Sequence, residues 1–176
     1  MVQAIETLAV DSISAGRLPG EQPLPGVYPL DLWRDEPDGA VLFWVDARAN
    51  LNGQREPVLL EVRAKLSDGM WQAATGMSAT ADPLEKASTA STPGLHYVSR
   101  SSQDGVFLTR ALATPEVALI RLEDDSGRVR DRPPGRHGRV LLGVTSEDPL
   151  TQAYALDHAG ERCPTEPLML WAPPKG

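Results

Sequence analysis

Pairs of residues that favour tight turns recur along the whole chain, and they constrain its fold more than any other feature. Each pair ends in glycine and separates two apolar-rich segments: Asp38-Gly39, Asn52-Gly53, Asp68-Gly69, Asp104-Gly105, Ser126-Gly127 and Ala159-Gly160. Glycine adopts positive φ without steric cost, and Asp or Asn tolerates the left-handed region, so such pairs are typical of β-hairpins. We therefore expect a series of short strands joined by tight turns.

The segments between these turns have the residue patterns of strands. Residues 40–48 form an apolar run that is typical of a central strand covered on both faces. Apolar and charged residues alternate in residues 58–66, which predicts a half-buried antiparallel strand with Glu61, Arg63 and Lys65 on its polar face. Further strands are predicted at residues 27–33, 70–74, 95–100, 105–112, 116–123, 139–146, 151–157 and 166–171.

These strands predict an all-β fold, specifically an antiparallel two-sheet β-sandwich that resembles an immunoglobulin-like arrangement in outline. Two long connections, residues 76–94 and 130–139, favour a sandwich over a regular barrel. The single cysteine rules out the internal disulfide of antibody domains. We expect a weakly ordered segment or short helix in residues 1–25, a single sandwich domain in residues 26–171 and an extended tail in residues 172–176.

Length and charge restrict the classes of function. The 176 residues are enough to bury a core without disulfides or a structural metal. The net charge of -7 disfavours binding to nucleic acid or to anionic membranes. Glu6 and Asp11 interrupt the apolar residues at the N-terminus, which therefore resembles neither a signal peptide nor a transmembrane helix. We expect a cytoplasmic protein that binds neither nucleic acid nor membrane.

No motif predicts a catalytic, metal or cofactor site. Residues 155–163 bring Asp157, His158 and the only cysteine close together in sequence, but Asp157 and Gly160 match the first and last positions of a four-residue turn. His96 precedes serines and an aspartate that form another polar turn. The chain has no zinc-ligand spacing and no glycine-rich phosphate loop. We therefore predict no catalytic residue, no metal ligand and no cofactor.

One basic segment predicts recognition of a partner. It contains Arg128, Arg130, Arg132, Arg136 and Arg139, with Asp131 as its only acid. In an extended chain the first three arginines share one face, which suits a phosphate, an acidic peptide or an acidic surface of a second copy. The alternative is a charged hairpin whose arginines pair with neighbouring acids and prevent aggregation at the sheet edge. No aromatic residue lies among the arginines, so nucleic acid is not the predicted partner.

These observations favour a non-catalytic binding or scaffold module that acts through contacts with a protein partner or by self-association. Two alternatives stay open. One is a small-molecule-binding protein or enzyme with a pocket under residues 76–94, and the other is a structural component that assembles in many copies. We expect reversal of Arg130 and Arg132 to glutamate to abolish partner capture and to leave the melting temperature nearly unchanged.

Overall fold

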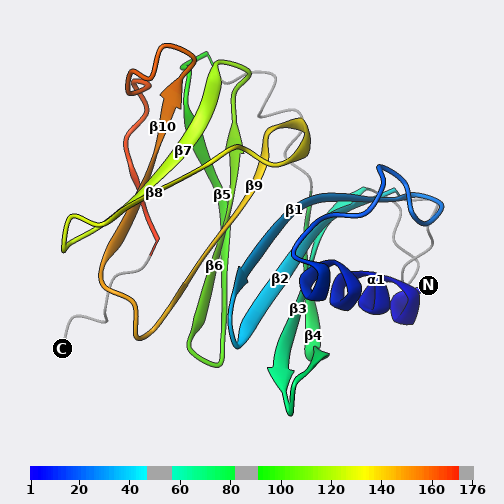
Figure 1. The fold of residues 1–176 in the computed structure, drawn as a ribbon. Helices are drawn as coiled ribbons and strands as arrows, with labels where there is room; N and C mark the ends of the chain where they lie inside the picture. Colours follow the sequence, from blue (N-terminus) through cyan, green and yellow to red (C-terminus); the bar gives the residue numbers. More distant parts are fainter. Residues whose placement is uncertain (47–56, 82–90, 171–176) are drawn as a thin grey trace. The chain divides into compact units, whose positions relative to one another are not determined.

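The computed structural model describes residues 1–46, 57–81 and 91–170 (Figure 1). These residues are mostly β, with one N-terminal helix and three antiparallel sheets of four, four and three strands. The chain divides into two compact units, Met1–Asp82 and Pro83–Gly176. The β-rich fold and the N-terminal helix are confirmed, but the described residues form three sheets where two were expected. The single domain in residues 26–171 stays a prediction, and it spans parts of both units.

The first unit consists of one helix and sheet A, whose strand order is β1-β2-β3-β4. Its elements are α1 (Val2–Ala15), β1 (Val27–Asp35), β2 (Asp38–Val45), β3 (Val58–Ser67) and β4 (Met70–Ala81). Ile5, Ala9 and Ile13 recur every four residues and form the buried stripe of α1. They share a core with Phe43 of β2 and Val62 of β3, among other residues. Because α1 covers one face of sheet A, that face needs no second sheet, and this explains the departure from a simple sandwich.

The hairpin between β1 and β2 turns two residues earlier than the sequence predicts. Glu36 and Pro37 form the turn, and the Asp38-Gly39 pair already belongs to β2. Gly39 allows α1 to pack closely on β2, because a Cβ atom at this position would lie 2.6 Å from Cγ2 of Ile13 in α1. The predicted hairpin is therefore present, but Gly39 is required for packing against Ile13 and not for the turn.

The charged residues of β3 also differ from expectation. Lys65 is exposed, but Glu61 and Arg63 are only 1% and 7% exposed, so the prediction of a solvent-facing polar side is wrong at these two positions. Nε of Arg63 donates a hydrogen bond of 2.8 Å to Oε1 of Glu61. A buried charge is tolerated when an opposite charge and hydrogen bonds replace its water, and this ion pair meets that condition.

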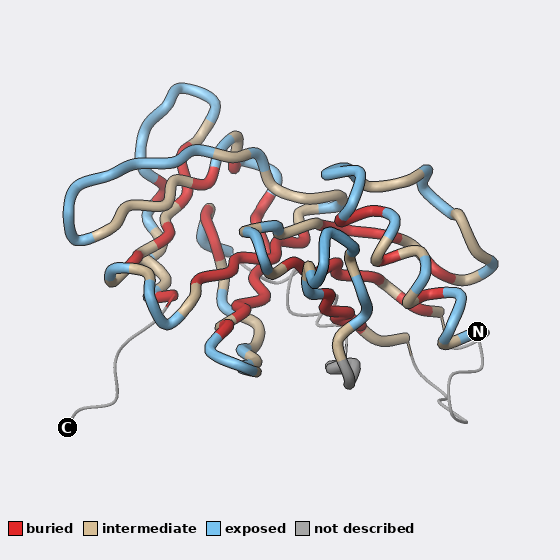
Figure 2. Tube along the Cα trace, turned by 60° about the horizontal axis from the view of Figure 1, so that its bottom comes forward, coloured by how far each residue is buried: buried red, intermediate tan, exposed pale blue. Residues whose placement is uncertain are grey.

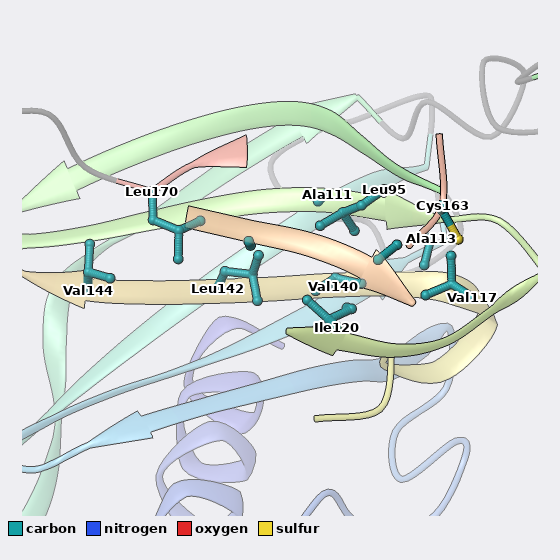
Figure 3. Packing of buried hydrophobic residues seen from close by; sticks show 12 residues of the cluster. Leu95, Ala111, Ala113, Val117, Ile120, Val140, Leu142, Val144, Cys163 and Leu170 are labelled. Atoms are coloured by element: carbon teal, nitrogen blue, oxygen red, sulfur yellow. The ribbon is translucent and has the colours of Figure 1, made fainter. Parts of the chain in front are cut away.

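The second unit contains two sheets. Sheet B has the order β5-β6-β9, and sheet C has the order β11-β10-β7-β8. The elements are β5 (Leu95–Gln103), β6 (Val106–Ala113), β7 (Val117–Asp124), β8 (Val129–Arg132), the 3₁₀ helix η2 (Arg136–Gly138), β9 (Arg139–Thr145), β10 (Thr151–Asp157) and β11 (Leu168–Met169). Both sheets contribute to one hydrophobic cluster, in which Ala111 and Leu142 of sheet B join Val117 and Ile120 of sheet C (Figure 3).

Most of the predicted turns are present. Both residues of Asp68-Gly69 and of Asp104-Gly105 have positive φ, as a two-residue hairpin turn requires. Gly127 and Gly160 also have positive φ, whereas Asn52-Gly53 lies outside the described residues. Burial follows the strands, and the hairpin turns are exposed (Figure 2). Strand β8 was not predicted from the sequence, because three of its four residues are charged and it has no alternation of apolar and polar residues.

Candidate functional site

The face of sheet C that points away from the hydrophobic cluster is the candidate site. In β7, Ile120 belongs to the hydrophobic cluster of the second unit and Leu122 packs against it. Because successive side chains of a strand point to opposite faces, the residues that alternate with these two point outward. Following the register to the neighbouring strands defines the outer face of sheet C: Leu119, Arg121 and Glu123 of β7, Val129 and Asp131 of β8, Gln152 and Tyr154 of β10, and Met169 of β11.

Three large hydrophobic residues are exposed on this outer face. Leu119, Val129 and Met169 are 37%, 45% and 43% exposed. They come from three different strands, and Met169 and Val129 lie at the two ends of one row across the sheet, with Gln152 and Glu123 between them. They share one face but are separated by polar residues, so they provide three apolar contact points and not a continuous apolar patch.

Polar contacts between neighbouring strands hold the charged side chains of the outer face in place. Nε and Nη2 of Arg121 donate hydrogen bonds of 2.7 and 2.6 Å to the two carboxylate oxygens of Asp131. The hydroxyl of Tyr154 donates to Oε2 of Glu123 at 3.1 Å, and the guanidinium of Arg162 lies 4.7 Å from the centre of the Tyr154 ring. Because these contacts already order the side chains, less side-chain conformational entropy would be lost when a partner binds.

The ion pair also shifts two pKa values. The hydrogen bonds from Arg121 lower the pKa of Asp131 below its usual value, and the same hydrogen bonds raise the pKa of Arg121. Both groups are therefore charged throughout the physiological pH range. This ion pair consequently persists when the solution pH changes near neutrality.

Two of the five predicted recognition arginines are held by backbone carbonyls. Nη1 of Arg132 donates to the carbonyl of Leu141 in β9 at 2.9 Å, and this contact links sheet C to sheet B. Arg139 is 8% exposed, and its Nη1 donates to the carbonyl of His137 at 2.8 Å. These side chains therefore stabilise the unit, and their guanidinium groups are already engaged.

The other three predicted arginines differ in exposure. Arg128 and Arg130 are exposed at the start of β8, whereas Arg136 is half-buried in η2. The hydroxyl of Ser126 donates to Oδ1 of Asp124 and makes the largest contribution to lowering the pKa of this carboxyl. The backbone N–H groups of Ser126 and Arg128 and the Arg128 charge lower it further. Within the part of the chain that the structure describes, the Arg130 guanidinium has no hydrogen bond or ion pair.

The turn at residues 157–160 is confirmed. Oδ1 of Asp157 accepts hydrogen bonds from the backbone of Ala159 and Glu161, and His158 is exposed at the tip. Cys163 instead belongs to the hydrophobic cluster of the second unit (Figure 3). Burial raises the pKa of its thiol, and the nearby negative charges of Asp157 and Glu116 raise it further. The thiol is therefore protonated at neutral pH.

The other segments with candidate chemistry are separate from the outer face. Nε2 of His96 lies 2.9 Å from the carbonyl oxygen of Thr92. Among the residues described here, no group of three or more His, Cys, Asp or Glu side chains could hold a metal ion. In the predicted loop 76–94, residues 76–81 belong to β4 and residues 82–90 lie outside the described residues, as does the predicted tail 172–176.

Comparison with known proteins adds no relative. The chain matches no protein-family model, no curated protein and no solved structure. No helix in residues 1–46, 57–81 or 91–170 is long and apolar enough to cross a membrane. The outer face of sheet C and the arginines beside it are therefore the features that bear on function.

Proposed function

We propose that this chain is a binding module that contacts a protein partner through the outer face of sheet C. The observation that carries the proposal is the exposure of Leu119, Val129 and Met169 on one face. An apolar contact surface stabilises a complex when it is removed from water, and interspersed fixed polar groups give the complex its register.

The partner surface that fits this face best is acidic and partly apolar. Arg162 lies over Tyr154 on the outer face. Arg128 and Arg130 are exposed at the β8 edge of the sheet, where their side chains lie on the opposite face, because Arg130 is paired with the inward-pointing Leu122. Asp131 does not offset these charges, because Arg121 neutralises it. An acidic partner that contacts the outer face and also reaches the β8 edge would therefore gain charge-assisted hydrogen bonds beside the exposed hydrophobic residues.

We also propose that the second unit is a two-sheet sandwich, immunoglobulin-like in outline. The hydrophobic cluster that sheets B and C share supports this proposal, and so does the contact of Arg132 with the carbonyl of Leu141. In such sandwiches the outward faces of the sheets stay available for partners while the inward faces form the core.

The test is a quantitative capture experiment with the full chain as bait in extract of the native host. A variant carrying Leu119→Asp and Met169→Asp adds two acidic charges to the outer face of sheet C. The matched control is Met70→Asp, which changes an exposed methionine of the first unit that is 63% exposed. We expect the double variant to lose at least about tenfold of the bound partner, because two apolar contacts become repulsive charges.

Two results would contradict the proposal. One is equal capture by the wild-type chain and the double variant when both have the same circular dichroism spectrum and melting temperature. The other is equal loss of capture in the Met70→Asp control. Light scattering on the purified chain tests the alternative of self-association, which predicts a particle mass that decreases in the double variant.

A further inference from the structure

Strand β8 forms one edge of sheet C. It consists of four residues, Val129–Arg132, and among the strands that the structure describes it pairs with β7 alone. Its first three residues are exposed. An edge strand presents backbone N–H and C=O groups that can pair with another extended chain.

The direction of these groups follows from the hydrogen bonds of the β7–β8 hairpin. The N–H of Asp124 in β7 donates to the carbonyl of Arg128 at 3.1 Å. In an antiparallel pair, hydrogen-bonded and non-hydrogen-bonded positions alternate, so Arg130 and Arg132 also direct their backbone groups toward β7. The N–H and C=O groups of Val129 and Asp131 consequently point to the open side. They have no hydrogen-bond partner among the described residues.

The side chains beside this open edge carry net positive charge. Arg128 and Arg130 are exposed, and the Arg130 guanidinium has no ion-pair partner in the part of the chain that the structure describes. The one acid of the strand, Asp131, is bound by both carboxylate oxygens to Arg121 on the outer face. A strand that approaches β8 therefore meets Arg130, Arg128 with the Asp124 carboxylate beside it, and no unpaired carboxylate of β8 itself.

A second copy of the same edge is a poor occupant. If two copies of β8 paired with each other around a two-fold axis, Arg128 and Arg130 of one copy would lie opposite or next to Arg128 and Arg130 of the other. Like charges at such positions are destabilising, and proteins use them to prevent edge-to-edge aggregation. The same arrangement attracts an extended chain that carries acidic residues.

We infer that β8 accepts an extended acidic segment of the partner as an additional strand of sheet C. This inference rests on the proposed function and specifies how the partner is recognised. The backbone groups of Val129 and Asp131 form the new ladder, and Arg128 and Arg130 bind alternate carboxylates of the incoming segment. Backbone pairing provides affinity for any extended chain, and the arginines select the acidic one.

The probe is a panel of short fluorescent peptides in which glutamate alternates with valine or threonine, made in both registers. Binding to the full chain is measured by fluorescence anisotropy. We expect Kd values below about 1 mM, and a loss of at least about tenfold in affinity in the Arg128→Glu and Arg130→Glu variants. Arg17→Glu reverses an exposed arginine of the first unit and is the matched control, for which we expect no change.

Backbone pairing has its own measurement. N-methylation of alternate peptide residues removes donors from one side of the incoming strand, so one of the two methylated series should lose binding and the other should retain it. Hydrogen exchange should slow at the amides of Val129 and Asp131 when the peptide is bound. A peptide with lysine in place of glutamate should not bind, because Arg128 and Arg130 repel it.

Three results would overturn the inference. They are the failure of the whole panel to bind, equal binding of the glutamate and lysine peptides, and insensitivity to both N-methylated series. The Leu119→Asp and Met169→Asp variant separates this inference from the proposed function. If the variant loses partner capture while the panel does not bind, the outer face is the binding site and strand addition is wrong. If the panel binds while capture is unchanged in the variant, the outer-face proposal is wrong and β8 remains the binding element.

Discussion

Arg121 of β7 and Asp131 of β8 lie opposite each other, and two hydrogen bonds of 2.7 and 2.6 Å join their side chains. This pair holds the short edge strand against its neighbour on the outer face. It also removes the only negative charge of β8 from competition for the exposed arginines. The same contact therefore contributes to the hairpin and to the charge of the edge.

The ion pair makes stability depend on pH. Because Arg121 lowers the pKa of Asp131 in the folded chain, the ionised carboxylate stabilises the fold. This contribution is complete above the unfolded-state pKa of about 4 and is lost as the pH falls through the lower folded-state pKa. The free energy of unfolding should therefore fall more steeply below about pH 4 in the wild-type chain than in Asp131→Asn. Urea unfolding at a series of pH values measures both curves, and parallel curves would contradict the prediction.

Arg132 and Arg130 should respond differently to truncation. Arg132→Ala removes the hydrogen bond to the carbonyl of Leu141 and should cost about 1–3 kcal/mol, because the donor is charged. Arg130→Ala removes an exposed side chain and should change stability by less than about 0.5 kcal/mol. Thermal unfolding of the two variants measures the difference, and equal melting temperatures would exclude a structural role for Arg132. The expectation that both arginines can be reversed at no cost to stability should hold for Arg130 alone.

Gly39 should not tolerate a side chain. A methyl group at this position would lie 2.6 Å from Cγ2 of the buried Ile13, so Gly39→Ala should destabilise the first unit by about 1–3 kcal/mol. Gly20→Ala is the control, because no heavy atom lies within 4 Å of its added Cβ. Chemical denaturation followed by far-ultraviolet circular dichroism measures both variants. A double-mutant cycle with Ile13→Ala should give less than the sum of the single effects, and full additivity would contradict the proposed contact.

The thiol of Cys163 should react slowly in the folded chain. It is 6% exposed, and its raised pKa lowers the thiolate fraction at neutral pH. We expect a disulfide reagent to modify it at least about tenfold more slowly in buffer than in denaturing urea, because only the exposed thiolate attacks. Absorbance of the released thiol measures both rates. Rapid modification without denaturant would place the thiol outside the hydrophobic cluster.

Local patterns determined the elements of this chain. The ten predicted strand segments correspond to β1–β7 and β9–β11, and the short helix expected within residues 1–25 corresponds to α1. Glycine turn pairs and period-two alternation determine strands because they act over a few neighbouring residues. The turn at Asp157 and Gly160 was predictable for the same reason.

Which residues these elements bury and which side chains they bring into contact was decided only by the tertiary structure. Packing of α1 on sheet A determines the role of Gly39, and burial of Glu61 and Arg63 depends on residues distant in sequence. The partners of the arginines followed no local rule: Arg132 binds a carbonyl of β9, whereas Arg130 stays exposed. The composition of the outer face also depends on the register of four strands, since its exposed hydrophobic residues, Leu119, Val129 and Met169, are far apart in sequence. Periodicity assigns side chains to the two faces of a strand, but strand pairing and packing determine which face is buried and which residues meet on it.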